Sequence, residues 1–161
     1  MLAGNPVCSE FLAKTSYCED KQPLPPYSTS LANCASKSCP ADKKLSPQSC
    51  ECAHPYEGTM YFRAPSSREL SNYTLFHQLE ISLWTKLNLT PGSVSLQKPF
   101  FNVDDLLQVH LAFFPSVGEY FNRSEVQRMG FALNYYIFMP PEQFGSFYFR
   151  PFPYTFGGIK G

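Results

Sequence analysis

The residues of this chain best suited to chemistry are its six cysteines, which all lie in the first third of the sequence: Cys8, Cys18, Cys34, Cys39, Cys50 and Cys52. Cysteines can form disulfides, bind a metal as thiolates, or react with oxidants. An even number of cysteines clustered in a loop-like segment is typical of disulfides formed in an oxidising compartment. Disulfides are therefore the favoured interpretation, and the sequence leaves their pairing open.

The spacing of the cysteines bears on which disulfide pairs can form in two places. Cys50 and Cys52 are separated by one residue. A bond between such near neighbours is strained, so we expect each sulfur to pair elsewhere. Cys8 and Cys18 could close a small local loop.

Two other uses of these cysteines stay open from the residues alone. A redox role needs a thiolate, and Lys37, Lys43 and Lys44 could lower a thiol pKa, whereas Glu51 would oppose this. Oxidation would then give a sulfenic acid and finally a disulfide.

A zinc site would use Cys34, Cys39, Cys50 and Cys52 with His54, but the Cys-x-Cys spacing is too tight for a typical zinc knuckle. We predict no metal site and no cofactor.

Three asparagines lie in N-glycosylation sequons: Asn72, Asn88 and Asn122. Each falls near the end of a predicted helix, where a glycan can project into solvent. Together with the cysteines, the sequons favour an extracellular location over chance sequons in an intracellular protein.

Composition excludes several classes of function. The chain has 161 residues, with 13 basic and 13 acidic side chains. This balance leaves no excess of positive charge for nucleic acid, and no basic amphipathic run favours a membrane surface. No stretch approaches the roughly 20 apolar residues that cross a bilayer. No signal peptide is visible, so we expect a cytosolic chain or a piece of a longer protein.

The chain divides into two regions, residues 1–52 and residues 53–161. The first contains the cysteines, many serines and six prolines, and we expect irregular structure that depends on disulfides. In the second, strands are predicted over residues 59–63, 93–97 and 107–113 and around Phe147 and Phe149. Asn102 to Asp105 reads as a turn.

Two helices are predicted between these strands. Ser66 and Glu69 fit a capping box at the start of the first helix, and Pro91-Gly92 should end it. Its apolar stripe contains Leu70, Leu75, Phe76, Leu79, Leu83, Trp84 and Leu87. The second helix should start near residues 122–125, with Val126, Met129 and Leu133 on one side.

The order strand, helix, strand, strand, helix, strand predicts an α+β, ferredoxin-like βαββαβ sandwich that follows a disulfide-rich irregular segment. Both helices should cover one face of a four-stranded antiparallel sheet, formed by Met60, Phe62, Val94, Leu96, Val109, Leu111, Phe113, Phe147 and Phe149. The opposite face is expected to carry Tyr61, Arg63, Gln97, Gln108, His110, Tyr148 and Arg150. That face is either half-solvated or a docking surface for the cysteine-rich segment or a partner.

Enzyme signatures are missing from the sequence. It contains no nucleophile elbow, no His-Glu-x-x-His motif and no phosphate-binding glycine loop. His54, His77 and His110 are scattered, and Asp104 and Asp105 fit the turn better than a catalytic pair. We therefore expect a non-catalytic chain.

Several segments resemble a known family of receptors. Residues 2–8, with Cys18 after them, look like the closing cap of a plant leucine-rich-repeat solenoid. Residues 46–66 are similar to the segment between repeats and membrane in plant leucine-rich-repeat receptor-like kinases of the group implicated in sensing extracellular hydrogen peroxide and quinones. Residues 121–124, 140–145 and 153–156 fit the same group, so the resemblance covers nearly the whole chain.

The resemblance implies an extracellular, membrane-proximal fragment of a single-pass protein. The repeats would precede the fragment, and a transmembrane helix and a serine/threonine kinase domain would follow it. By position, Cys34, Cys39, Cys50 and Cys52 match the group's proposed redox-sensing cysteines. The implied partners are a small oxidant, hydrogen peroxide or quinone, and a co-receptor or second copy of the chain. Nucleic acid is not among them, and the fragment meets the membrane only through the helix outside it.

The strand and helix order also resembles SEA domains, which lie next to membranes in animal receptors and mucins. Some SEA domains cleave themselves at a strained Gly-Ser between strands two and three. Gly92-Ser93 precedes the predicted second strand instead, which argues against self-cleavage because strain must lie at the reacting bond. Two functions are weighed first: perception or relay of an oxidant signal through cysteine oxidation, or a passive glycosylated spacer or dimerisation module with inert disulfides. An enzyme is the third alternative.

Overall fold

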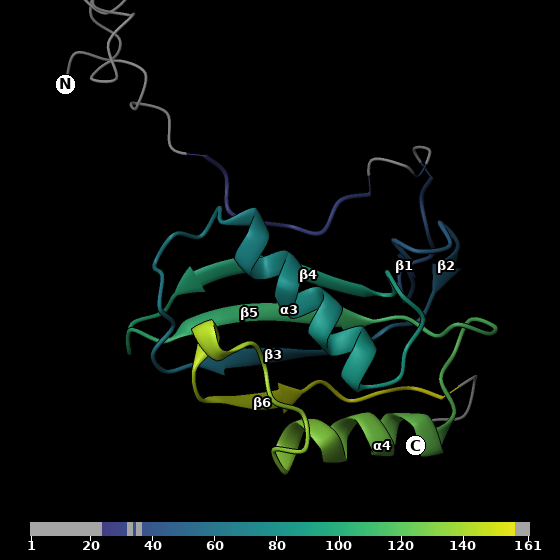
Figure 1. Ribbon diagram of the computed structural model, residues 1–161. Coiled ribbons are helices and arrows are strands. Elements are labelled where there is room, and N and C mark those ends of the chain that lie inside the picture. Colours follow the sequence, from purple (N-terminus) through teal and green to yellow (C-terminus); the bar gives the residue numbers. More distant parts are fainter. Residues whose placement is uncertain (1–23, 32–33, 35–36, 157–161) are drawn as a thin grey trace, which may run out of the picture.

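A computed structural model describes residues 24–31, 34 and 37–156 of the chain. Its elements, in chain order, are β1 (Lys44–Leu45), β2 (Cys52–Ala53), β3 (Tyr56–Phe62), α3 (Tyr73–Lys86), β4 (Val94–Phe101), β5 (Leu107–Phe113), α4 (Arg123–Asn134), the short 3₁₀ helix η2 (Glu142–Phe144) and β6 (Phe147–Pro151). From β3 onward the order is the predicted alternation of strands and helices (Figure 1). The structure is therefore a mixed α and β fold with two α-helices in the described part.

The strands form two antiparallel sheets. The larger has the order β4-β5-β3-β6, and the smaller is the two-stranded pair β1-β2. In the larger sheet, Met60 of β3 lies opposite Val109 on one side and Phe149 on the other. Since alternate residues of a strand face the same way, this register places the apolar side chains of all four strands on one face.

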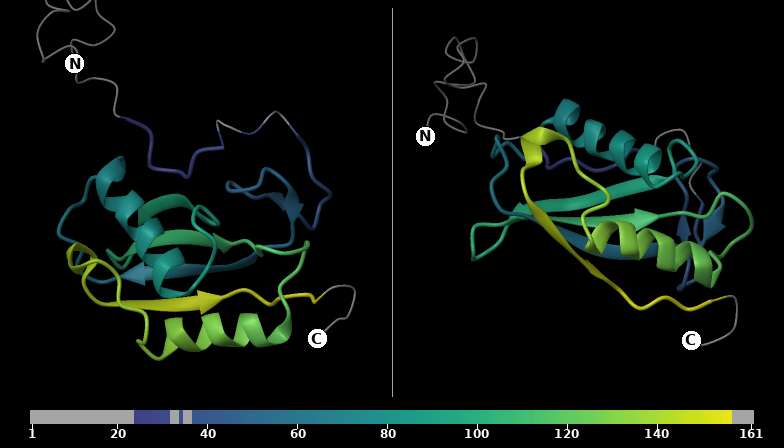
Figure 2. Two further views of the ribbon diagram at one scale, coloured as in Figure 1. Left: turned by 45° about the vertical axis from the view of Figure 1, so that its right-hand side comes forward. Right: turned by 60° about the horizontal axis from the view of Figure 1, so that its bottom comes forward.

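The predicted covered face is confirmed. All nine of its residues are buried, and they share one core cluster with α3 and α4. Leu75, Leu79 and Leu83 contribute from α3, and Met129 and Leu133 from α4. The helix α3 crosses the sheet and contacts β4, while α4 runs beside β6 (Figures 1 and 2).

The predicted start of the first helix is wrong. It begins at Tyr73, and Asn72 is its N-cap, with Oδ1 accepting a hydrogen bond from the Leu75 backbone. A capping box at Ser66 would occupy the Ser66 N–H with Glu69, but this N–H donates to the carbonyl of Gln143 at 2.7 Å. A tertiary backbone contact therefore replaces the local cap.

The first helix also ends earlier than Pro91-Gly92. Its last residue is Lys86, with Leu87 as C-cap, and Asn88 adopts the left-handed conformation at φ 59°. The Leu89 N–H donates to the Trp84 carbonyl at 2.8 Å. This is the pattern of a Schellman motif with asparagine in the position that usually carries glycine.

The first strand starts earlier than predicted, because β3 spans Tyr56–Phe62 rather than residues 59–63. The second helix and the turn before the third strand agree with the structure. Asn122 and Glu125 form a reciprocal capping box at the start of α4. The turn at residues 102–105 is closed by Oδ1 of Asn102, which accepts from the backbone of Asp104 and Leu106. The second strand extends beyond residue 97, because a bulge at Lys98 lets the edge strand β4 continue to Phe101.

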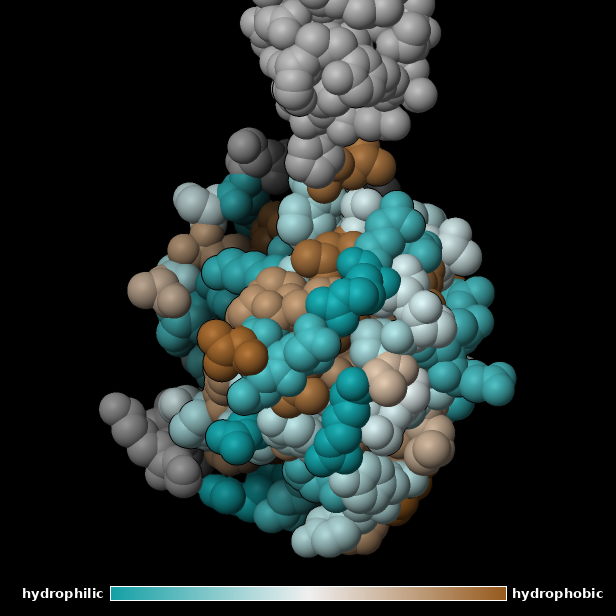
Figure 3. All heavy atoms as spheres, turned by 90° about the vertical axis from the view of Figure 1, so that its left-hand side faces the viewer, coloured by the Kyte–Doolittle hydropathy of each residue, from teal (hydrophilic) through white to brown (hydrophobic). Residues whose placement is uncertain are grey.

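The surface is largely hydrophilic, with hydrophobic side chains in separate patches on the face shown in Figure 3. In the described residues no helix has the length and apolar character needed to span a bilayer.

Candidate functional site

The candidate site contains two disulfides, which join Cys34 to Cys50 and Cys39 to Cys52. Their Cα–Cα distances are 5.3 Å and 5.6 Å, within the usual range for a bridged pair. The expectation that Cys50 and Cys52 pair elsewhere is confirmed. The two bridges interleave, since each crosses the loop that the other closes. Cys8 and Cys18 lie outside the described residues.

A short hairpin presents Cys50 and Cys52. Strands β1 and β2 pair with Leu45 opposite Cys52. Ser46 closes the connection, because its N–H donates to the Glu51 carbonyl and its carbonyl accepts from the Cys50 N–H, each at 2.9 Å. Cys50 itself has φ 58°, so the tight turn uses a left-handed residue that is not glycine. Strand β2 contains residues 52 and 53, so it lies across the predicted boundary between the cysteine-rich region and the α+β region.

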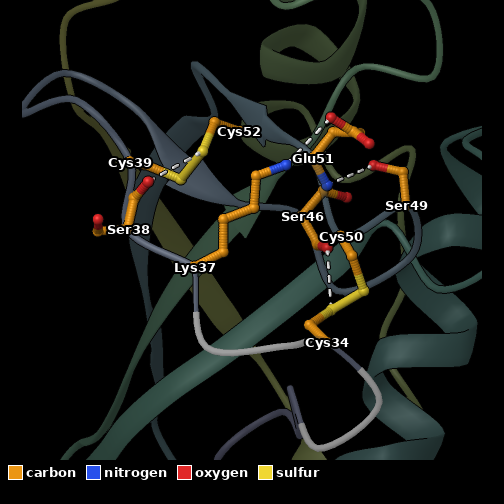
Figure 4. A network of polar contacts seen from close by, with 9 residues as sticks. All are labelled: Cys34, Lys37, Ser38, Cys39, Ser46, Ser49, Cys50, Glu51 and Cys52. Carbon is orange, nitrogen blue, oxygen red and sulfur yellow. Dashed lines mark hydrogen bonds and ion pairs between the residues drawn. A yellow bond between two sulfur atoms is a disulfide. The ribbon is translucent and has the colours of Figure 1, made fainter.

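Polar groups surround the sulfurs (Figure 4). Sγ of Cys34 lies 4.0 Å from the Ser46 carbonyl oxygen, and Sγ of Cys52 lies 3.8 Å from the Ser38 carbonyl oxygen. A bridged sulfur has no hydrogen to donate, so these are contacts only. Every described cysteine is bridged. The described site therefore contains no thiolate that could attack an oxidant or bind zinc.

The lysines near the cysteines bind carboxylates. Nζ of Lys37 lies 3.4 Å from Glu51, and Nζ of Lys43 lies 2.5 Å from Glu119. The hydrogen bond to Glu119 raises the pKa of Lys43. Lys44 lies 2.5 Å from Glu57. These ammonium groups connect the disulfide segment to its own hairpin, to the loop before α4 and to the large sheet.

The small hairpin docks on one end of the open sheet face. Ala53 packs with Ala112 and Phe114 in a small buried cluster. Beside it, Glu57 accepts hydrogen bonds from Lys44 and from Nε2 of His110, the latter at 2.8 Å. Burial opposes ionisation of Glu57, but the hydrogen bonds from His110 and Lys44 outweigh it and lower the Glu57 pKa. The cysteine segment therefore rests on a charged contact as well as an apolar one.

A second anchor lies after the hairpin. The Tyr154 hydroxyl donates to the carbonyl of His54 at 2.7 Å and accepts from the Phe121 N–H at 2.9 Å. Burial raises the pKa of Tyr154 to about 12, so the hydroxyl stays a donor at neutral pH. The His54 ring lies 4.7 Å from the Tyr154 ring, centroid to centroid. His54 thus has a structural position, whereas His77 lies on α3 and His110 on β5.

The sequon asparagines lie at helix ends, as predicted. Asn72 and Asn122 are the N-caps of α3 and α4, and Asn88 follows the C-cap of α3. Asn122 and Asn88 are exposed, and Asn72 is partly buried. Capping uses Oδ1, whereas a glycan is attached through the side-chain nitrogen, so the chemistry of capping and glycosylation is compatible.

Sequence reasoning did not identify the partners of Glu57 or a buried carboxylate, Glu80, which is 3% exposed. Glu80 lies on α3 and accepts from the hydroxyls of Tyr27 and Thr29, both at 2.5 Å. His77 lies 3.3 Å away on the same helix. The only sequence signal was a charged residue one position after Leu79 in the apolar stripe, and no local pattern identifies partners 51 and 53 residues away.

Comparison with known proteins identifies a relative. The chain is 33% identical over 166 aligned positions to a probable leucine-rich repeat receptor-like protein kinase of Arabidopsis thaliana. The match covers 99% of this chain but 17% of that protein. No family model matches the chain, and no solved structure matches it. The chain is therefore homologous to a limited stretch of a plant receptor-like kinase.

Proposed function

We propose that this chain is the extracellular, membrane-proximal part of a plant leucine-rich-repeat receptor-like kinase. The observation that carries the proposal is the match along 99% of the chain. The two disulfides are typical of a protein that folds in an oxidising compartment, and the sequons are typical of the surface of a secreted protein. The chain itself is non-catalytic in this proposal, and the kinase activity belongs to another region of the whole receptor.

The fold proposed for residues 53–161 is the ferredoxin-like arrangement shared with SEA domains. The strand order β4-β5-β3-β6, with both helices on one face, supports it. In the proposal, this compact unit connects the leucine-rich repeats to the membrane-spanning part of the receptor.

Within the receptor, we assign a relay role to the disulfide module, by which we mean the segment held by the Cys34–Cys50 and Cys39–Cys52 bridges. In its reduced form, a thiolate would attack a peroxide oxygen, giving a sulfenic acid and hydroxide, which becomes water on protonation. The partner thiol would then attack the sulfenic sulfur, forming the disulfide and releasing a second water. A quinone would instead accept two electrons and two protons from the dithiol and become a hydroquinone. The described form would be the oxidised end of either reaction.

A second function is favoured by one observation: all described cysteines are already bridged. In this alternative the disulfides are inert, and the module is a glycosylated spacer or dimerisation unit. Structural disulfides in secreted proteins normally resist mild reductants.

Thiol counting by mass spectrometry separates the two. The secreted chain is titrated with a dithiol reductant, alkylated at each step, and then exposed to dilute peroxide. The relay requires that a bridge open while circular dichroism still shows the folded sheet, and that peroxide restore it. Sulfurs that become available only on unfolding would refute the relay and support the spacer. A Cys34→Ser/Cys50→Ser variant leaves the other bridge to be tested alone.

A further inference from the structure

The open face of the large sheet carries an arrangement of side chains that the functions above do not use. The strand register places Gln97, His110 and Arg150 in one row with Thr59. The next row contains Phe100, Gln108, Tyr61 and Tyr148. The cysteine hairpin covers only the end of this face near Ala112.

Two hollows, of about 440 and 380 Å³, lie along this face. They share Lys44, Gln97 and His110, so together they form one trough from the hairpin to the sheet centre. Its charged lining comprises Lys37, Lys43, Lys44, Lys98 and Glu57, in addition to His110. The first three lysines pair with Glu51, Glu119 and Glu57, so the positive charge left in the trough is that of Lys98.

Beyond the trough, two arginines extend the positive charge. The guanidinium carbons of Arg63 and Arg150 lie 5.4 Å and 5.9 Å from the centre of the Tyr148 ring. Both arginines and Lys98 are exposed, and the ion pairs found among the described residues do not include them. These three cations are therefore available to a ligand.

We propose that this face binds an extended acidic saccharide, a polymer of uronic-acid residues. Arginine and lysine match its carboxylates, and arginine can bind them with two parallel hydrogen bonds. Gln97 Nε2 donates to Ser95 and Gln108 Oε1 accepts from Asn102, which leaves Oε1 of Gln97 and Nε2 of Gln108 to match its hydroxyls. Phe100 and Phe152, each 44% exposed, match the apolar faces of sugar rings.

Size and charge distribution favour a polymer over a small anion. The cations extend from β4 to β6, which are three strand spacings, or roughly 14 Å, apart. A single carboxylate cannot reach both ends. An acidic peptide would supply carboxylates without a row of hydroxyls. A nucleic acid would require the basic excess that this chain, with 13 basic and 13 acidic residues, does not have.

The test is direct binding, measured by calorimetry with the secreted, folded chain. The probes are an oligogalacturonate, a neutral dextran oligomer, polyglutamate and single-stranded DNA. The test variants are Arg63→Ala/Arg150→Ala and Lys98→Ala. The matched control is Arg123→Ala on α4, which removes an exposed arginine from the other side of the sheet and leaves the Asn122 sequon intact.

We expect the oligogalacturonate to bind and dextran not to bind. The double arginine variant should weaken binding by about tenfold or more, Lys98→Ala by less, and Arg123→Ala should have no effect. Absence of oligogalacturonate binding, or equal losses in the arginine and control variants, would overturn the proposal. Equal or tighter binding of polyglutamate or DNA would overturn the assignment to a saccharide. The measurement does not depend on the receptor proposal, because it uses the isolated chain.

Discussion

The hydroxyl of Tyr27 donates a 2.5 Å hydrogen bond to Oε2 of Glu80, joining a segment before the disulfides to the buried side of α3. Thr29 donates to the same oxygen, and its Oγ1 accepts from the Leu96 N–H at 2.7 Å. Burial and the contact with Glu80 raise the pKa of Tyr27, which keeps its proton in place. The segment around residues 27–29 is thus attached to both α3 and β4.

This attachment predicts the effect of removing the carboxylate. Glu80→Ala leaves two hydroxyl donors without their acceptor, so we expect a loss of about 1–3 kcal/mol in the free energy of unfolding, measured by urea denaturation. Gln78→Ala, at an exposed position of the same helix, should change it by less than about 0.5 kcal/mol. Equal effects in the two variants would show that the hydrogen bonds to Glu80 contribute nothing to the free energy of unfolding.

The Glu57 contact predicts a pH dependence of stability. Its folded pKa is lowered from the usual 4.5 by His110 and Lys44 against the opposing effect of burial. The stabilisation is therefore present above the unfolded pKa and is lost as pH falls through the lower, folded value. The free energy of unfolding, measured by denaturation from about pH 6 to about pH 3, should fall as the pH falls, and Glu57→Gln should reduce this decline. Glu142→Gln, at an exposed carboxylate, serves as control; a Glu57→Gln curve parallel to the native one would refute the contact.

Capping and glycosylation at Asn122 can be separated. Asn122→Ala should destabilise the unglycosylated protein by about 1 kcal/mol, whereas Asn122→Asp should keep the cap. Ser124→Ala leaves the cap and removes only the sequon. In a secreting eukaryotic host, all three variants should lose one glycan by intact mass. A glycan count unchanged by Ser124→Ala would mean that Asn122 is not modified.

The central strand β3 leaves no room for a side chain at Gly58. A Cβ added there would lie 2.5 Å from Cζ of Phe149 and 2.7 Å from the Arg150 carbonyl oxygen. Gly58→Ala should therefore cost about 1–3 kcal/mol, seen as a lower thermal midpoint. Adding Phe149→Leu should recover part of that loss if the ring is the obstacle. A Gly58→Ala protein as stable as the native one would contradict the close packing of β3 and β6.

Local sequence patterns predicted most of the strands and helices, because these elements depend mainly on residues that are close together in the sequence. The strand predicted over residues 107–113 has the same bounds as β5, and the second helix starts where predicted, at a cap formed by Asn122 and Glu125, three residues apart. The Ser66–Glu69 pair had the same pattern and failed, because Gln143 occupies the Ser66 N–H. A capping motif predicts a helix start only where tertiary contacts leave its groups free.

The candidate site was less predictable because its groups meet across long separations. The sequence showed that Cys50 and Cys52 would pair elsewhere, but choosing Cys34 and Cys39 as their respective partners required the hairpin β1-β2. Likewise, the lysines that could have lowered a thiol pKa bind Glu51, Glu119 and Glu57 instead. Two of these carboxylates lie outside the cysteine segment.

Disulfide mapping of the secreted chain is the most direct test of the account, because the site is defined by its interleaved bridges. Proteolysis without reduction, followed by mass spectrometry, should yield peptides that link Cys34 with Cys50 and Cys39 with Cys52. Cleavage between Cys50 and Cys52 is needed to distinguish the pairs. Linkage of Cys34 with Cys39, or of Cys50 with Cys52, would contradict the hairpin, the docking on Glu57 and the relay built on them.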